Sequence, residues 1–437
     1  MLKPAVRMVI ALLLAGCAAA TSRAPAADPG PRLDRPGAGA PLPGLSVAEM
    51  ALFLAGRERF LERVDVAGGL GPRFNLDSCA GCHSHPAVGG TSPSVNPQIA
   101  MASSAGATNV VPAFIEPAGP VREARFKLRT DGKTRDGGVA NLFTIAGRAD
   151  APGCRLAQPD FAREITRGNV IFRIPSPLFG VGLLEAIPDH HILATWTSTA
   201  TERAALGIAG RPNRGHATSA SAGDAGIARL GWKAQTASLL FFAGEAYNVE
   251  QGVTNALFPS ERDAPLGCRF TPSPEDGGER SDVQRFTDFM RFLAPPQAAA
   301  PTPSSVRGQE LFGTIGCALC HTPVLSTGRS PSGALNEKAV VLYSDLLLHR
   351  MGPGLADDVV QGQAGPDEFR TAPLWGLGQR LFFLHDGRTR DLIDAIQAHA
   401  SAKDRGLPAS EANAVVERYR ALTNEQQQDL LNFLRSL

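Results

Sequence analysis

The sequence carries little excess charge and few aromatic residues. Its 43 Lys and Arg nearly balance its 42 Asp and Glu, which leaves a formal net charge of +1, and only 6% of the residues are aromatic. The chain has neither a net positive field nor a basic stretch with interleaved aromatic residues, and these are the features that attract nucleic acid. We therefore expect no nucleic-acid partner.

The apolar run near the N-terminus, residues 8–16, is too short to span a bilayer. It follows Lys3 and Arg7, as in a signal peptide, and it ends in a lipobox in which Cys17 would be acylated after cleavage. The alternative is an ordinary secretory peptide that is cut in the following alanines. Either reading places the mature protein in the periplasm, and the lipobox would attach it to a membrane only through a lipid anchor.

Cysteine is scarce, and four of the seven cysteines fall in two copies of the motif Cys-x-x-Cys-His, at Cys79–Cys82–His83 and Cys317–Cys320–His321. This spacing lets two thiolates add to the vinyl groups of one haem while the adjacent imidazole reaches the iron. A zinc ribbon needs its second cysteine pair roughly 15 to 20 residues on, and a redox dithiol needs no following histidine. The motifs therefore predict two covalently attached haem c groups, with His83 and His321 as iron ligands.

Two further cysteines, Cys154 and Cys268, lie in similar Gly-Cys-Arg contexts between the haem motifs. In an oxidising compartment such a pair more often bridges than not, and closing so long a loop could contribute roughly 4 to 5 kcal/mol. We predict a disulfide between them, with two buried free thiols as the alternative.

Gly and Pro are abundant, with 46 and 34 residues, while the 43% hydrophobic content is enough for real cores. The sequence predicts a mainly α fold of two cytochrome c-like haem domains with long irregular loops, the N-terminal one enlarged. Capping boxes predict helices beginning at Ser46 with Glu49 and at Thr423 with Gln426. The expected segments are a signal peptide at 1–17, a flexible Ala/Pro/Gly tether at 18–45, an N-terminal haem domain at 46–294, a Pro/Ala linker at 295–304 and a C-terminal cytochrome c domain at 305–437.

Several stretches resemble the di-haem oxidoreductase family, which is related to the bacterial di-haem cytochrome c peroxidases. The resemblance spans roughly residues 46–437 and is carried by Phe74–His83, Gly182–Pro188, Gly231–Gln235, Tyr343–His349, Phe369–Gly378 and Leu384–Arg388. It implies that the N-terminal haem binds and splits hydrogen peroxide, while the C-terminal haem accepts electrons from a small periplasmic donor. It also allows a calcium ion between the domains, although no carboxylate cluster in the sequence singles out a site.

Peroxide chemistry at the first iron needs a group that moves a proton between the two peroxide oxygens. Glu185, in an otherwise apolar segment, is the candidate, since apolar surroundings raise the pKa of a carboxyl. Its place in the chain is similar to that of the distal glutamate of the relatives. The alternative is an ion pair with an arginine such as Arg173. His85, His190 and His191 are weaker candidates for a distal ligand. His85 reads more readily as a surface or propionate contact, and the pair His190 and His191 as a solvated turn.

The second iron needs a sixth ligand. In the relatives a methionine or a tyrosine follows the His-Asp-Gly turn, and here the corresponding stretch offers His399. Met351, flanked by backbone-breaking residues, is the rival, and His385 reads as structural. Trp232 and Trp375 are candidates for an aromatic bridge between the haems, with core packing as the alternative. Arg370 and Arg388 are candidate propionate partners by charge.

The sequence thus predicts an exported di-haem oxidoreductase with a peroxidase mechanism. Two alternatives stay open: an electron carrier with both irons six-coordinate, and a haem enzyme that oxidises residues of a partner protein, as the methylamine dehydrogenase-maturing relative does. An exchangeable ligand on the first haem would favour either enzyme over the carrier.

Overall fold

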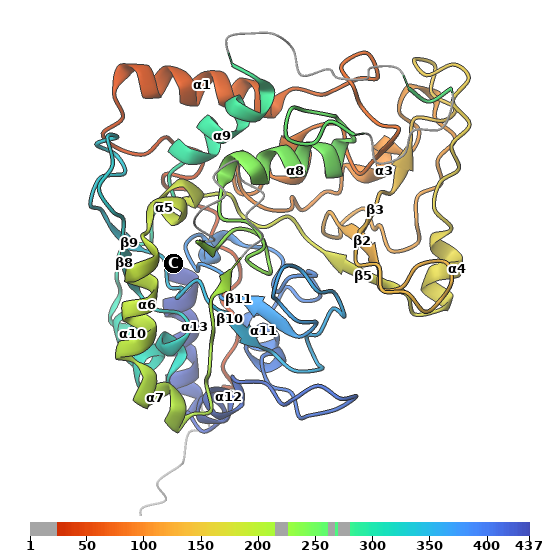
Figure 1. Ribbon diagram of the computed structural model, residues 1–437. Helices are drawn as coiled ribbons and strands as arrows, with labels where there is room; N and C mark the ends of the chain where they lie inside the picture. Colours follow the sequence, from red (N-terminus) through yellow and green to blue (C-terminus); the bar gives the residue numbers. More distant parts are fainter. Residues whose placement is uncertain (1–23, 215–225, 261–266, 270–279) are drawn as a thin grey trace, which may run out of the picture.

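A computed structural model describes residues 24–214, 226–260, 267–269 and 280–437 of the protein (Figure 1). The predicted signal sequence, with Cys17, lies outside the described residues. Helices and strands are connected by long irregular segments, as the high glycine and proline content predicts.

One pair of crossing helices lies next to the first Cys-x-x-Cys-His motif, at the top left of Figure 1. It consists of α1 (Val47–Leu61) and α9 (Asp282–Phe292), and the predicted capping box of Ser46 and Glu49 begins α1. Gly56 allows the close approach, because a Cβ atom there would lie 2.3 Å from the Arg285 carbonyl oxygen.

A second pair repeats this arrangement in the C-terminal half. Helices α10 (Pro303–Thr314) and α13 (Asn424–Ser436) cross beside the second motif, and Thr423 with Gln426 forms the predicted capping box of α13. Gly308 is the contact point, since a Cβ atom there would lie 2.0 Å from the Asp429 carbonyl oxygen. Each half therefore brings a leading helix and a closing helix together at a glycine.

The remaining helices line or connect these two parts. They are α2 (Cys79–Cys82), α3 (Gln98–Met101), α4 (Phe161–Thr166), α5 (Val181–Ala186), α6 (Asp189–Ser198), α7 (Ala200–Ala205), α8 (Leu239–Gln251), α11 (Leu392–Ala398) and α12 (Asn413–Arg420), with single 3₁₀ turns at Ser104–Gly106, Cys317–Leu319 and Leu377–Gln379. Helix α8 lies in the upper middle of Figure 1.

Within the described ranges, the strands are short and pair antiparallel in five small sheets. One sheet has three strands in the order β3-β2-β5, with Glu123 opposite Arg173 in its register. The strands are β1 (Arg73–Phe74) with β4 (Phe143–Thr144), β2 (Glu123–Phe126) with β3 (Val139–Ala140) and β5 (Val170–Arg173), β6 (Asn213–Arg214) with β7 (Ile227–Ala228), β8 (Val324–Ser326) with β9 (Ala339–Val341), and β10 (Leu348–Arg350) with β11 (Glu368–Arg370).

The expectation of a mainly α fold built from two cytochrome c-like domains is wrong. The described residues form both helices and strands, and irregular segments connect these elements. The largest apolar core joins residues from both sides of the expected 295–304 linker, among them Phe53, Leu342 and Trp375. Conversely, Ile208 packs into the core between α10 and α13. Helical periodicity within each half could not reveal cores that cross the linker.

Residues 24–45, the described part of the flexible tether expected at 18–45, lie against both halves of the protein. The Asp28 carboxylate accepts two hydrogen bonds of 2.7 Å from the Arg435 guanidinium, and both side chains are almost fully buried. Further along, the Leu42 amide donates to the Phe292 carbonyl oxygen at 2.7 Å. Composition indicated flexibility here, but the segment is held first on α13 and then on the end of α9.

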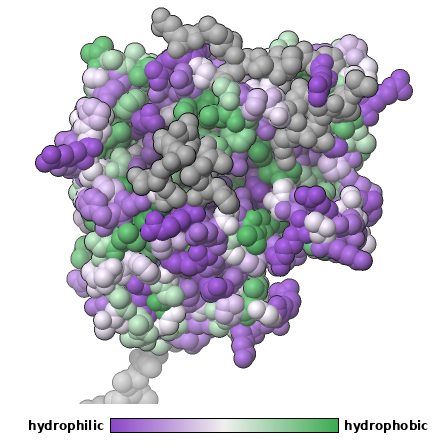
Figure 2. Space-filling model, in the orientation of Figure 1, coloured by the Kyte–Doolittle hydropathy of each residue, from purple (hydrophilic) through white to green (hydrophobic). Residues whose placement is uncertain are grey.

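On the face shown in Figure 2, apolar side chains form separate patches between hydrophilic ones. None of the helices among the described residues has the length and apolar character needed to cross a bilayer. Cys154 and Cys268 are joined by a disulfide, which ties the loop after Ala151 to residues 267–269.

Candidate haem-binding sites

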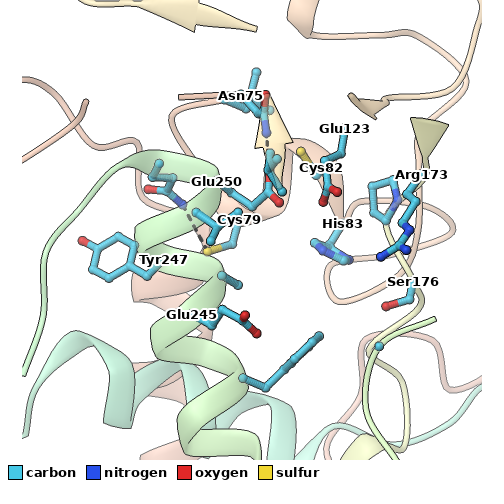
Figure 3. A pocket seen from close by; sticks show the side chains of 18 of the residues that line it. Asn75, Cys79, Cys82, His83, Glu123, Arg173, Ser176, Glu245, Tyr247 and Glu250 are labelled. Carbon is cyan, nitrogen blue, oxygen red and sulfur yellow. Dashed lines mark hydrogen bonds between the residues drawn. The ribbon is translucent and has the colours of Figure 1, made fainter. Parts of the chain in front are cut away.

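The first Cys-x-x-Cys-His motif lines a cavity of about 330 Å³ (Figure 3). Ser78 caps α2, its hydroxyl accepting a hydrogen bond from the Gly81 amide at 3.2 Å, so that Cys79 and Cys82 start and end one helical turn. A Cβ atom at Gly81 would lie 2.1 Å from the Leu76 side chain, which explains the glycine inside the motif.

The His83 ring is oriented for metal binding. Its Nδ1 lies 2.9 Å from the Gly90 carbonyl oxygen and can only donate there, which leaves Nε2 with a free lone pair. Burial lowers the pKa of His83 to about 4, so the imidazole is neutral at physiological pH. A neutral ring with a fixed tautomer is the form that ligates iron.

The second motif repeats this geometry in a cavity of about 230 Å³. His321 Nδ1 lies 2.9 Å from the Tyr343 carbonyl oxygen, and burial lowers the pKa of His321 to about 4. Tyr343 adopts a positive φ of 51°. The two histidines therefore present equivalent Nε2 atoms to two separate cavities.

The four motif cysteines are free thiols. Burial raises the pKa of Cys79 and of Cys317 to about 12. A redox-active dithiol needs a depressed thiol pKa, so these surroundings disfavour that reading of the motif.

Glu185 does not line the first cavity, so its predicted place there is wrong. Helix α5 directs its carboxylate to the start of α8, where Oε1 accepts a hydrogen bond from the Leu239 amide at 2.8 Å. Its Oε2 lies 3.3 Å from the guanidinium of Arg291. The alternative reading of an arginine pair was correct in kind, although Arg173 instead pairs with Asp357. The apolar residues that flank Glu185 in the sequence do not determine the side of α5 on which its carboxylate lies.

The acids that line the first cavity are Glu123, Glu245 and Glu250. Glu123 on β2 and Glu250 on α8 hydrogen-bond to each other. Glu250 also accepts a hydrogen bond of 2.6 Å from the Asn75 amide group, which is drawn as a dashed line in Figure 3. Burial, and then the neighbouring charge of Glu123, raises the pKa of Glu250 to about 8.

The pKa of Glu123 is shifted in the opposite direction. Burial acts to raise its pKa, but the charges of Arg125 and Arg173 outweigh that effect and lower it. The pair therefore holds one negative charge on Glu123 and one proton on Glu250 near neutral pH. A signal in the sequence could have found Glu250, because it shares a helical face with Ala243, Ala246 and Tyr247, which is otherwise apolar.

The other histidines proposed near the first iron lie elsewhere. His85 Nε2 is 2.8 Å from the Gln379 carbonyl oxygen, and this contact links the segment after the first motif to the C-terminal half. His191 on α6 contacts the Ser326 carbonyl oxygen at 2.7 Å, and its ring centroid lies 4.4 Å from that of His190.

All three candidate sixth ligands of the second iron, His399, Met351 and His385, line the second cavity. His399 Nδ1 is 2.7 Å from the Ala395 carbonyl oxygen, so its Nε2 has the same free lone pair as that of His321. His385 instead stacks on the Phe369 ring at a centroid distance of 4.3 Å.

His349 also lines this cavity but is fully engaged, because Asp345 and Glu411 lie 2.9 and 2.8 Å from its two ring nitrogens.

Trp232 lines both of these cavities and a small cavity of about 20 Å³ between them. Its indole Nε1 donates to the Ile174 carbonyl oxygen at 2.9 Å, which fixes the ring. Trp375 lines only the small cavity. Of the two tryptophans singled out by the sequence, the structure brings Trp232 between the two motifs.

A buried ionic cluster joins the two halves beside these cavities. Arg173 lies 2.6 Å from Asp357, and the Lys233 ammonium lies 3.0 Å from the other oxygen of the same carboxylate. Lys233 also donates to the carbonyl oxygens of Gly365 and Glu368 at 2.8 and 3.0 Å. Among the described residues, no group of three or more His, Cys, Asp or Glu is arranged to hold a metal ion. The calcium ion implied by the resemblance stays a prediction.

Polar atoms without a protein partner point to the kind of group that the cavities accept. The Tyr419 hydroxyl in the second cavity and Oε1 of Gln235 and Gln251 in the first are buried and make no hydrogen bond within the described protein. Buried groups of this kind are normally satisfied, so an amphipathic ligand with polar edges fits both cavities. A haem has these properties.

A family model described as "Di-haem oxidoreductase, putative peroxidase" matches residues 142–437. The match includes the second motif, α8 and Trp232, and it begins after the first motif. A comparison with curated proteins found no sequence match.

Among solved structures, the chain is similar to the diheme peroxidase BthA from Burkholderia thailandensis E264, with 16% identity over 94% of each chain and a TM-score of 0.33. A MauG-like protein associated with microbial copper homeostasis is 19% identical over 36% of this chain, with a TM-score of 0.25. The hydrazine synthase of Kuenenia stuttgartiensis is 18% identical over 45% of this chain, with a TM-score of 0.25. The chain spans 52% and 60% of the lengths of the latter two proteins.

Proposed function

Because the chain belongs to the di-haem oxidoreductase family, we propose that it is an exported enzyme that reduces hydrogen peroxide with electrons from a small periplasmic donor. The family implies two haems, and we propose that both are attached covalently, one through Cys79 and Cys82 and the other through Cys317 and Cys320. The support is the pair of cavities described above, each with two free thiols beside a neutral histidine.

The different lining of the two cavities carries the proposal. The first is lined by three glutamates, Glu123, Glu245 and Glu250, which can move protons. The second offers His399 and Met351 facing the same space as His321. Such an asymmetry suits one reactive centre and one six-coordinate centre that passes electrons. We propose His399 as the sixth ligand of the second iron, because its Nδ1 contact leaves Nε2 free.

Reducing one peroxide molecule to two water molecules consumes two protons and two electrons. A haem bound in the first cavity would supply the electrons that cleave the oxygen–oxygen bond. Glu250 holds a proton at neutral pH and can donate it to the departing oxygen, while Glu123 keeps its charge through Arg125 and Arg173. Asn75 holds the Glu250 carboxyl in place from the other side.

Electrons would enter through the second centre and cross to the first beside Trp232. The indole is fixed by its bond to Ile174 and is shared by the linings of both cavities, so it shortens the gap that electrons must cross.

We also propose a periplasmic location, with Cys17 acylated. The disulfide of Cys154 and Cys268 supports an oxidising compartment, because such bonds rarely persist in the cytosol. Metabolic labelling with a fatty acid would test the anchor: label in the wild type and none in a Cys17→Ser variant is the expected result.

The deciding experiment is a pair of low-temperature electron paramagnetic resonance spectra of the oxidised and half-reduced holoprotein, with and without cyanide. A high-spin signal that shifts on adding cyanide, together with steady turnover of peroxide by a reduced small cytochrome, is expected. Two low-spin signals that do not change when cyanide is added, in both redox states, would instead identify an electron carrier. An exchangeable iron without peroxide turnover would favour an enzyme that oxidises residues of a partner protein.

A further inference from the structure

Two arginines are buried beside the second cavity in a way that the chain itself does not explain. Arg370 ends β11, Arg380 follows the 3₁₀ turn at Leu377–Gln379, and each is only 8% exposed. Both line the second cavity and also the small cavity that separates it from the first. Burial lowers the pKa of each to about 10, and the charge of Arg380 contributes to the shift of Arg370.

The hydrogen bonds of these arginines leave their charges uncompensated. Arg370 donates to the carbonyl oxygens of Gly231 and Thr371, both at 3.0 Å, and carbonyl oxygens carry no net charge. The acid that acts on Arg370 is Asp345, which already bonds to His349 at 2.9 Å. No carboxylate in the described part of the chain pairs with Arg380.

Two positive charges buried beside the same cavity are strongly unfavourable unless an anion meets them. That anion must come from outside the chain. A planar guanidinium pairs best with a carboxylate, through two parallel hydrogen bonds. Both arginines line the cavity of Cys317 and Cys320 and neither lines the cavity of Cys79 and Cys82, so the carboxylate belongs to the second cavity.

We propose that Arg370 and Arg380 together bind one propionate of the haem in the second cavity and hold that edge of the haem beside Trp232. The Arg370 amide donates to the Trp232 carbonyl oxygen at 2.9 Å, and its side chain bonds to the preceding residue, Gly231. One residue thus holds both the propionate and the backbone of the tryptophan that lines the two cavities. Arg370 and Arg380 are positioning residues in this role. The proposal rests on haem attachment at Cys317 and Cys320 and does not depend on peroxidase activity.

The test compares purified holoproteins of the wild type and the Arg380→Gln, Arg380→Lys and Arg370→Gln variants. Haem content is measured first. A wild-type protein without haem at the second motif would contradict the proposed attachment at Cys317 and Cys320, on which the propionate contact depends. The midpoint potential of each haem is then titrated spectroelectrochemically, and resonance Raman spectra record the propionate bending band. Losing a buried positive charge beside the second haem destabilises its reduced form, so Arg380→Gln should lower that potential and shift the propionate band. Arg380→Lys, which keeps the charge, should restore most of the potential.

Arg329→Gln is the matched control, because Arg329 lies in the same half, its side chain is 92% exposed, and it lies 3.5 Å from Glu337. It should change neither potential. An unchanged second potential and propionate band in Arg380→Gln, with full haem content, would overturn the proposal, as would a shift confined to the first haem. If Arg370→Gln does not fold, the Arg380 variants alone decide the question.

Discussion

Glu123 and Glu250 share a hydrogen bond at the wall of the first cavity, although one lies on a strand and the other on a helix far along the chain. Two carboxyl groups in contact cannot both be ionised without strong repulsion, so the pair retains a proton near neutral pH. The arginines beside Glu123 decide that the proton stays on Glu250.

Stability should therefore fall as the pH rises from about 5 to 8. The folded pKa of Glu250, about 8, lies above its ordinary value of 4.5, so in this window the folded state binds a proton that the unfolded chain has released. Urea unfolding of the wild type at several pH values should show this slope, and Glu250→Gln should flatten it. Glu202→Gln, at an exposed position on α7, should leave the slope unchanged.

Peroxide turnover should decline above a pH of about 8, where Glu250 loses its proton. Replacing it by glutamine removes the proposed proton donor with little change in size, and we expect turnover to drop roughly 100-fold or more. Steady-state rates across the pH range provide the measurement. A Glu250→Gln enzyme with wild-type rates would show that another group, such as Glu245, supplies the proton.

Gly308→Ala should destabilise the protein by about 1 to 3 kcal/mol, because the new methyl group collides with the backbone of α13. Gly313→Ala is the matched control on the same helix, where a Cβ atom meets nothing within 4 Å. Alanine there should be neutral or stabilise the helix by up to about 1 kcal/mol. Equal unfolding free energies for the two variants would contradict the close crossing of α10 and α13.

Asp357→Asn should cost about 3 to 5 kcal/mol, because it leaves the buried charges of Arg173 and Lys233 without their shared acid. Asp358→Asn changes the next residue, whose side chain is 48% exposed and pairs with Lys127 at 3.0 Å, and it should cost less than about 1 kcal/mol. Chemical denaturation of both variants checks the contrast. A small effect of Asp357→Asn would mean that the cluster does not hold the two halves together.

Trp232→Phe should slow electron transfer between the two haems, because a smaller ring fills less of the space between the cavities. Stopped-flow reduction of the second haem, followed by oxidation of the first, would measure the rate. Trp375→Phe, which changes the lining of the small cavity only, serves as the control. Identical rates in the two variants would remove Trp232 from the electron path.

The sequence predicted local features whose signals are contained in a few neighbouring residues. The capping boxes at Ser46 and Thr423 are present in the structure, because each depends on residues three positions apart. Glu185 was misplaced because the side of α5 on which it lies depends on the start of α8, which is distant in the chain. Arg380 was missed for the same reason, since the groups that surround it come from other elements.

The two Cys-x-x-Cys-His motifs by themselves determined the expected chemistry, because the order of residues in the sequence fixes the spacing of the two thiols and places the imidazole next to them. The resemblance carried by short motifs determined the family, which the match over residues 142–437 shows. The tertiary structure alone decided which acids face the first cavity, which arginines lack a carboxylate, and that Trp232 lies between the cavities. Those relationships arise from packing between distant segments, where the burial of each charge is set by neighbours that no local pattern identifies.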